Sequence, residues 1–362
     1  MRRYLIPFAA LLITCVSLSA LYGTIYPDNP WRSDSVFMRQ GLWIVLGWLA
    51  FFVFSNFYYR GLINFVYPFY ALVIISLVLV LFLGGARLGA QRWIKLWWFN
   101  FQPSEFAKLA VILVFSLYFS RKGLGDIRLD IRSLSFFKGL VLPFLIIAVP
   151  FGLILKQPDL GTALLLVFIF LGVVYFSGVK MRYITLVLAL GIAFSPLAWN
   201  HLKGYQKDRI AVFLNPDSDP LGAGYTIIQS KIAIGSGRLL GKGWLSGTQG
   251  QLNFLPEAHT DFIFGIVAEE IGFLGCVFLI LLYYLIIRQG LIISGNCDDN
   301  FGKLLSFAIS IMLAFQVYVN ISMTMGLSPV VGVPLPLLSY GGSSMLMNFI
   351  CLGILSNIEK RG

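Results

Sequence analysis

The chain has 362 residues, of which 58% are hydrophobic and only 12% are charged. Soluble domains carry roughly 45–50% apolar and about 25% charged residues, so this composition excludes a surface covered mainly by water and indicates an integral membrane protein. The net charge of +11 does not indicate a nucleic-acid partner, because the basic residues are scattered between apolar stretches, and the four distant cysteines show neither a disulfide framework nor a zinc motif.

Ten apolar windows follow one another along the chain, each near the length that crosses a bilayer as a helix. Their unbroken hydrophobicity differs from the alternation of membrane β-barrel strands. The sequence therefore predicts an all-α polytopic bundle of about ten transmembrane helices within one domain, residues 1–362. The windows are residues 5–22, 41–57, 65–84, 105–120, 139–155, 160–177, 183–199, 262–287, 304–326 and 344–358.

The basic residues predict the orientation of these spans. With the N-terminus in the cytoplasm, fourteen Lys and Arg residues lie in inner loops and six in outer ones, as the positive-inside rule requires. Arg2 and Arg3 before the first span are also typical of a signal peptide, but nine further spans favour an uncleaved helix. Both termini are then cytoplasmic, and residues 200–261 form one large extracytoplasmic loop.

Three ionisable residues fall near the outer ends of two spans, where a charge requires a partner or a function. Glu105 and Lys108 are three residues apart, so they share a helix face and can form an ion pair. Asp159 follows Pro158 at the start of the sixth span, where it can stabilise the helix N-terminus. An alternative is that all three form a polar network at the floor of a cavity, a pattern that Glu269 and Glu270 would extend.

The large outer loop contains a glycine-rich stretch, residues 235–250, that includes Arg238 and Lys242. Glycines allow a backbone to approach a ligand closely, so the stretch could bind phosphate, although an ordinary flexible loop also has this composition. The preceding residues 225–234 are apolar but interrupted by polar side chains, which suits a segment at the membrane surface.

Three further polar residues, Glu257, His259 and Asp261, stand directly before the eighth span. They are too few for a stable zinc site. Asp261 could cap the following helix, because aspartate is a favoured N-cap residue. It could equally serve as an acid or base, and local sequence leaves both interpretations open.

Six motifs in order resemble the SEDS family of shape, elongation, division and sporulation proteins. The short N-terminus and the form of the loop are more similar to the elongation branch, RodA, than to the division branch, FtsW. The motifs are QPSEFAKLA (102–110), KQPDLGTA (156–163), QSKIAIGSGRLLGKG (229–243), FLPEAHTDFIF (254–264), AEEIGFLG (268–275) and PLPLLSYGGSS (334–344).

This resemblance implies a ten-helix fold with an outward cavity in the bacterial plasma membrane. It also implies a peptidoglycan glycosyltransferase that polymerises lipid II together with a class B penicillin-binding transpeptidase. Asp261 matches the essential carboxylate of the family motif. We expect it to act as the general base for the sugar hydroxyl, with inversion to a β-1,4 link.

The other site residues are predicted from what the reaction requires besides a base. Cations are expected to stabilise the departing diphosphate, and Glu257 is expected to orient the loop. Ser339 and Ser343, just before the last span, either line the cavity or form a turn between packed helices. The predicted substrate-binding residues are Arg209, Lys231, Arg238, Lys242, Glu257, Ser339 and Ser343, and the predicted polar network is Glu105, Lys108 and Asp159.

No tightly bound cofactor or protein metal site is predicted, although Mg²⁺ or Mn²⁺ could accompany the substrate diphosphate. A lipid II flippase is the main alternative, because charges within spans also mark translocation pathways. It would depend on Glu105, Lys108 and Asp159 at least as much as on Asp261. A division polymerase like FtsW and a non-catalytic scaffold for the transpeptidase are further alternatives.

Overall fold

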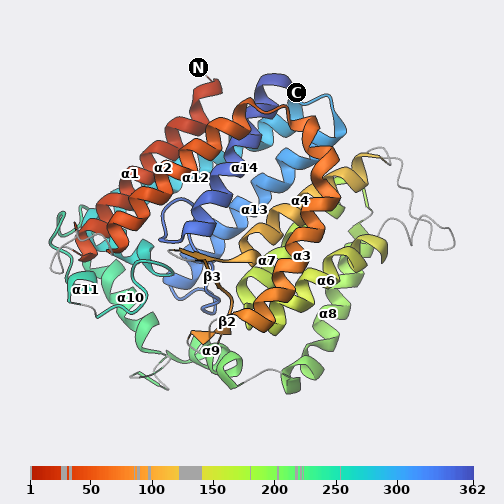
Figure 1. The fold of residues 1–362 in the computed structure, drawn as a ribbon. Coiled ribbons are helices and arrows are strands. Elements are labelled where there is room, and N and C mark those ends of the chain that lie inside the picture. Colours follow the sequence, from red (N-terminus) through yellow and green to blue (C-terminus); the bar gives the residue numbers. More distant parts are fainter. Residues whose placement is uncertain are drawn as a thin grey trace.

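A computed structural model describes residues 2–25, 31, 35–84, 86–87, 90–96, 99–121, 141–179, 181–201, 204–216, 219–220, 222, 224–252 and 254–362. Most of the inner loop after the fourth span, with four of the basic residues counted for the orientation, lies outside these residues. The described part is an all-α bundle with two short β-hairpins (Figure 1).

Ten described helices lie at the ten predicted spans. Six of them are long and apolar enough to cross a membrane, and two more, α6 and α7, are shorter apolar helices. The ten are α1 (Leu5–Ile25), α2 (Val36–Asn56), α3 (Val66–Leu83), α4 (Pro103–Ser120), α6 (Leu142–Lys156), α7 (Leu160–Phe176), α8 (Met181–His201), α12 (Ile263–Asn296), α13 (Asn300–Thr324) and α14 (Gly342–Arg361).

Short elements complete the described chain. The hairpins between α3 and α4 are antiparallel, and three short helices occupy the large loop between α8 and α12. Figure 1 places both termini at one end of the bundle and α9 to α11 toward the other. The short elements are η1 (Arg2–Tyr4), η3 (Tyr59–Phe65), β1 (Ala86–Arg87), β2 (Ala90–Gln91), β3 (Ile94–Leu96), β4 (Phe99–Phe101), α9 (Gly204–Leu214), α10 (Tyr225–Ser236) and α11 (Thr248–Gln251).

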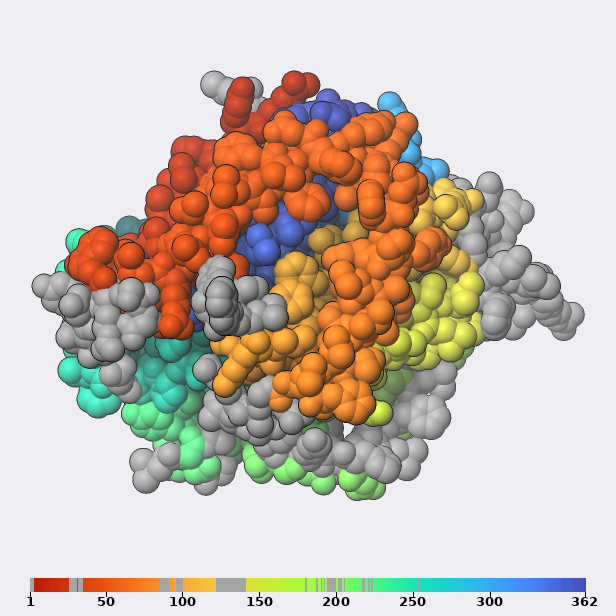
Figure 2. Space-filling model, in the orientation of Figure 1, coloured from red at the N-terminus to blue at the C-terminus, as the bar shows by residue number. Residues whose placement is uncertain are grey.

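The centre of the bundle is built around α14, which is buried from Ser343 to Ile358 apart from one partly exposed residue. Glycines on both α14 and α2 allow the two helices to approach closely. A Cβ at Gly47 would lie 2.2 Å from the Phe349 ring, and one at Gly342 would lie 2.1 Å from Trp43. Small residues have the same role in other membrane bundles. On the face drawn in Figure 2, a strip of α14 (blue) is visible between the red and orange helices, and the C-terminal end is visible at the top.

Because protein rather than lipid surrounds the inner helices, they can carry polar side chains. Glu105 and Lys108 on α4 are each 1% exposed, and the Lys108 Nζ lies 2.8 Å from the Glu105 Oε2. The predicted ion pair is therefore present. No contact joins it to Asp159 among the described residues, so the alternative of one shared network of the three side chains is not supported.

Breaking this pair is expected to destabilise the fold strongly. Lys108→Met leaves the Glu105 carboxylate buried without its partner, which costs about 3–5 kcal/mol, so the midpoint of thermal unfolding in detergent should fall sharply. The double variant Glu105→Gln/Lys108→Met should recover most of that loss. Arg60→Ala, which removes a half-exposed partner of Asp299, is the control and should change the midpoint little. Equal midpoints for Lys108→Met and Arg60→Ala would contradict this account.

Candidate functional site

Asp261 lies in the turn before α12, and hydrogen bonds from two other segments anchor its main chain. The Asn320 Nδ2 on α13 donates to the Asp261 carbonyl at 3.0 Å and to the Val333 carbonyl at 2.8 Å. In the segment before α14, the Ser339 Oγ donates to the Thr260 carbonyl at 2.6 Å and the Tyr340 N–H donates to the His259 carbonyl at 2.9 Å. The carbonyl groups of His259, Thr260 and Asp261 are thus each held by a residue from another part of the chain.

The Asp261 side chain does not cap α12. The N-cap position is Phe262, and it receives no side-chain cap, so the capping interpretation of Asp261 is wrong. The carboxyl instead faces the segment before α14, where a Cβ at Gly332 would lie 3.4 Å from the Asp261 Oδ2. Gly332 has a φ of 73°, a conformation that favours glycine. The carboxyl is therefore available for chemistry beside a turn that only glycine forms readily.

A second acid, Asp159, is held at the start of α7. Its carboxylate accepts hydrogen bonds from the Thr162 N–H, the Thr162 Oγ1 and the Ser104 Oγ, so it is the predicted helix-start carboxylate. The Arg92 Nη1 lies 3.8 Å from the Asp159 Oδ1. Arg92 also donates to the carbonyls of Gln157 and Pro158. These bonds fix the arginine against the turn between α6 and α7.

Arg209 on α9 approaches from another direction, and its Nη1 donates to the Val330 carbonyl at 2.9 Å. Gly161 of α7 packs against the Val331 carbonyl, 2.5 Å from where a Cβ would lie. Val330 and Val331 stand just before Gly332, so both α7 and α9 meet the segment that faces Asp261. We call Asp261, Asp159, Arg92 and Arg209 the Asp261 cluster.

The charges of this cluster act on Asp261. The pKa of its carboxyl is raised to about 6, chiefly by burial and then by the negative charges of Glu257 and Asp159, while Arg209 and Arg92 oppose the shift. Burial also lowers the pKa of His259, which favours a neutral imidazole at pH 7. A carboxyl with a pKa near 6 is still mostly ionised at neutral pH, yet it holds a proton more strongly than an ordinary aspartate. That combination suits a general base.

Other predicted site residues have structural partners. The Glu257 Oε2 accepts a hydrogen bond from the Thr260 Oγ1 at 2.9 Å, which fits its predicted role in orienting the loop. Ser339 bridges the Leu335 N–H and the Thr260 carbonyl, and the Ser343 Oγ accepts from the Gln102 N–H at 3.0 Å. Both serine hydroxyls thus tie segments together, as the turn interpretation predicts.

The remaining predicted cations lie away from these contacts. Lys242 pairs with Glu269 on α12, at 2.6 Å between Nζ and Oε1, and Arg238 stands close to it in the chain. Lys231 is exposed on α10, with its Cε 2.3 Å from where a Cβ on Gly326 would lie. Glu269 therefore has its own partner and does not extend the Asp159 network. Within the described residues, no group of three or more His, Cys, Asp or Glu side chains could hold a metal ion.

Sequence reasoning missed Arg92. It stands in the hairpin region between α3 and α4, far from Asp159 in the chain, and was counted only as an outer basic residue. No clear signal for this role was present in the sequence, because Arg92 has the same composition context as the other basic residues of outer loops. Its contact partner could not be deduced without the fold.

Comparisons with known proteins identify the family of this chain. A family model described as cell cycle protein, covering FtsW, RodA and SpoVE, matches residues 3–362. The chain belongs to this family. It is similar to the peptidoglycan glycosyltransferase MrdB of Escherichia coli K12, with 46% identity over 291 residues that cover 80% of this chain and 76% of the relative. It is also similar to the probable peptidoglycan glycosyltransferase FtsW of Trichlorobacter lovleyi, with 38% identity over 294 residues that cover 80% and 74%.

Solved structures of the family have the same fold. The rod shape determining protein RodA of Thermus thermophilus matches with a TM-score of 0.71 at 28% identity, covering 99% of this chain and 96% of that one. A chain from a peptidoglycan synthase complex, studied for the coordination of polymerization and crosslinking, matches with a TM-score of 0.81 at 31% identity, covering 98% and 96%. The family member described here is thus a multi-pass protein of the bacterial inner membrane.

A substitution at Gly332 can test whether the turn that faces Asp261 is required for activity. Gly332→Ala should lower activity and destabilise the protein by about 1–2 kcal/mol, because a side chain at positive φ is strained. Gly152→Ala is the matched control, since no atom lies within 4 Å of a Cβ at that position of α6. It should keep activity and gain stability slightly, as Ala does in place of Gly in a helix. Polymerisation rates and thermal midpoints of the two variants provide the comparison, and full activity in Gly332→Ala would refute the importance of this turn.

Proposed function

We propose that this protein is a peptidoglycan glycosyltransferase that polymerises lipid II into β-1,4-linked glycan strands during cell elongation. The observation that carries the proposal is the partly buried Asp261 carboxyl in a chain of this family. Its main chain is anchored by Asn320, and two arginines act on its charge. The relatives named as glycosyltransferases favour a polymerase over a flippase. The MrdB relative and the rod shape determining structure favour the elongation branch over the division branch.

The proposed reaction is an inverting displacement with Asp261 as the base. The Asp261 carboxylate removes the proton of the 4-hydroxyl on the incoming lipid II. That oxygen then forms a bond to C1 of the growing strand while the bond between C1 and the diphosphate oxygen breaks. The diphosphate leaves with its polyprenol and carries the electron pair of the broken bond. The proton remains on Asp261 until solvent removes it.

The leaving diphosphate gains negative charge, which nearby cations can stabilise. Arg92 and Arg209 are the cations that act on Asp261 in the structure, so we assign this role to them. Asp159 keeps Arg92 oriented through their ion pair. Arginine suits this task because its planar guanidinium binds phosphate oxygens through two parallel hydrogen bonds.

A divalent cation could accompany the substrate at the same place. The Asp261 carboxylate and diphosphate oxygens would supply oxygen donors of the kind that Mg²⁺ prefers and Mn²⁺ accepts, whereas the Asp159 carboxylate is occupied by Thr162, Ser104 and Arg92. Such an ion would neutralise charge on the departing group. Its main ligands would come from the substrate, because the described side chains form no closed ligand set.

The proposed partner is a class B penicillin-binding transpeptidase, which would crosslink the strands that this protein makes. The support is the likeness to a chain of a peptidoglycan synthase complex in which polymerization and crosslinking are coordinated. Lipid II and the growing strand are the proposed substrates.

The role of Asp261 as the general base can be tested with purified protein, its transpeptidase partner and labelled lipid II. Asp261→Ala and Asp261→Asn should each reduce the polymerisation rate by about 10²–10⁴-fold, the usual contribution of a positioned base. Asp208→Asn, which removes an exposed carboxylate on α9, is the matched control and should keep the parent rate. Polymer formed at the parent rate by both Asp261 variants would overturn the assignment, and lipid transport without polymer would indicate the flippase.

The pH dependence of the rate gives an independent test. Because the base must be ionised, the rate should fall as the pH drops through about 6, the pKa of Asp261. Arg209 lowers that pKa, so Arg209→Ala should move the midpoint to higher pH, whereas Arg209→Lys should leave it nearly unchanged. An unchanged midpoint in Arg209→Ala would show that the titrating group is not Asp261.

A further inference from the structure

Helix α12 contains a break near its N-terminal end. Gly272 has a φ of 72° and a ψ of −166°, so the helix is interrupted after Ile271. A loop of residues 237–243 binds the backbone groups around the break. The Phe273 N–H donates to the Arg238 carbonyl at 2.9 Å and the Leu274 N–H to the Leu239 carbonyl at 3.1 Å. In the opposite direction, the Lys242 N–H donates to the Glu269 carbonyl at 2.9 Å.

The loop is held rigidly against the break. Cβ atoms at Gly237 and Gly241 would lie 1.9 Å from the Ala268 carbonyl oxygen and 2.1 Å from the Glu270 carbonyl oxygen, so neither position has room for a side chain. The buried Glu269 carboxylate binds Lys242 and accepts from the Thr248 N–H at 2.9 Å. The glycine spacing that resembled a flexible loop is therefore a packing requirement.

The length of α12 places this loop near the membrane surface. Residues 273–296 number 24, and about 20 helical residues cross the hydrocarbon core, so the break lies close to the outer interface. From Ile263 to Gly272 the helix rises by about 14 Å at 1.5 Å per residue. The loop and the turn that contains Asp261 are therefore separated by roughly that length of helix.

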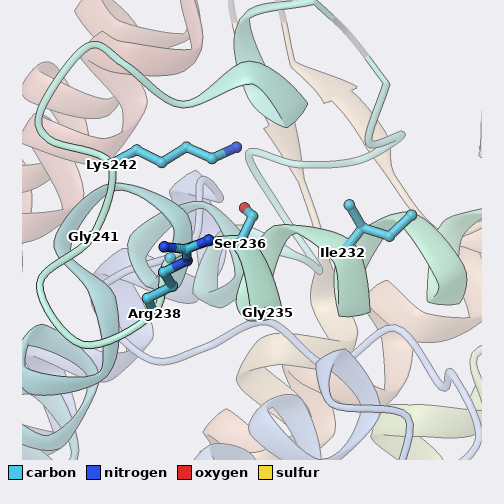
Figure 3. Close-up of a pocket in the computed structure, with 7 residues that line it drawn as sticks. Ile232, Gly235, Ser236, Arg238, Gly241 and Lys242 are labelled. Carbon is cyan, nitrogen blue, oxygen red and sulfur yellow. The ribbon is translucent and has the colours of Figure 1, made fainter.

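An open pocket of about 720 Å³ lies at this loop, lined by Ile232, Gly235, Ser236, Gly237, Arg238, Gly241 and Lys242. Figure 3 shows the polar ends of Arg238, Ser236 and Lys242 directed toward the same space. Glu269 compensates the charge of Lys242. Arg238 is exposed, and no carboxylate of the described residues forms an ion pair with it. The pocket thus has an uncompensated cation.

The surroundings of the pocket are strongly apolar. Leu239 is 66% exposed, Leu240 is 77% exposed and Trp244 is 59% exposed. An exposed arginine beside large apolar side chains at a membrane surface matches an amphiphile with an anionic head. A free soluble anion would gain nothing from the apolar residues, so the ligand chemistry indicated is a phosphate carried on a lipid.

We propose that the Arg238 pocket binds the diphosphate of the acceptor lipid II, and this inference rests on the proposed function. A polymerase that joins two lipid-linked substrates must accommodate two diphosphates. The donor's diphosphate departs from the reacting carbon and so lies at the Asp261 cluster. The acceptor keeps its diphosphate, which is separated from the reacting 4-hydroxyl by the disaccharide. The offset between Asp261 and the break in α12 provides that separation, with the diphosphate at the interface.

The proposal is tested by binding and by kinetics in neutral phosphatidylcholine nanodiscs. In the Asp261→Asn background, adding Arg238→Ala should weaken binding of labelled lipid II about tenfold, the loss expected for a charge-assisted contact. Arg238→Lys should lose much less. In the otherwise unaltered protein with its partner, Arg238→Ala should raise the KM for lipid II by a similar factor with a smaller effect on kcat.

Competition identifies the ligand. Undecaprenyl diphosphate should displace labelled lipid II from the Asp261→Asn protein and should do so about tenfold less well once Arg238 is Ala. If Arg238→Ala instead affects only competition by phosphatidylglycerol, the pocket binds a phospholipid headgroup and the acceptor assignment is wrong. Arg39→Ala, which removes an exposed arginine of α2, is the control for loss of charge and should bind like the parent.

The binding assay and the polymerisation assay can fail independently, so the pocket and the proposed function are tested separately. Unchanged lipid II binding in Arg238→Ala refutes the pocket even when the parent polymerises normally. A parent protein that makes no polymer with its partner refutes the proposed function, whatever the binding assay shows. Loss of binding together with a lower thermal midpoint in Arg238→Ala, but in neither Arg238→Lys nor Arg39→Ala, would indicate a structural effect and also count against the pocket.

Discussion

The arrangement of this protein depends on how residues 259–261 are anchored. Their carbonyl groups accept hydrogen bonds from Tyr340, Ser339 and Asn320, which belong to the last third of the chain. Because the main chain is fixed in this way, the Asp261 side chain is not needed as a helix cap and can be directed at other charges. The same segment before α14 is contacted by Arg209 of α9 and by Gly161 of α7, and Asp159 at the start of α7 holds Arg92.

Membrane burial explains why such an assembly can exist among hydrophobic helices. Polar groups in a bilayer must be satisfied by protein, and α4 and α14 are covered by their neighbours rather than by lipid. The break in α12 follows the same rule, since the loop of residues 237–243 supplies partners for its backbone groups. The outer half of the protein can thus place charged and irregular structure at the membrane surface, because the loop and the broken helix bind each other's backbone groups.

The spans could be predicted from the sequence because hydrophobic length is a local property, and Asp159 could be predicted at a helix start because Pro158 and the following apolar run mark one. Helix ends were less accurate. The eighth span was predicted to end at residue 287, but α12 continues to Asn296, since the apolar residues 291–293 resume the hydrophobic run after Arg288 and Gln289. Arg92 and the Lys242–Glu269 pair were missed as contacts, because their partners are distant in the chain. The apparent flexibility of the glycine-rich loop could be corrected only once the break in α12 was visible.

The central claim is that the Asp261 carboxylate removes the proton of the acceptor's 4-hydroxyl. The most direct measurement is a structure of the Asp261→Asn variant with its transpeptidase partner and bound lipid II. The account predicts that the side chain at position 261 lies about 2.6–3.2 Å from that hydroxyl oxygen, the reach of a general base. A bound disaccharide whose 4-hydroxyl is oriented by another carboxylate, with residue 261 turned away from every sugar, would contradict it.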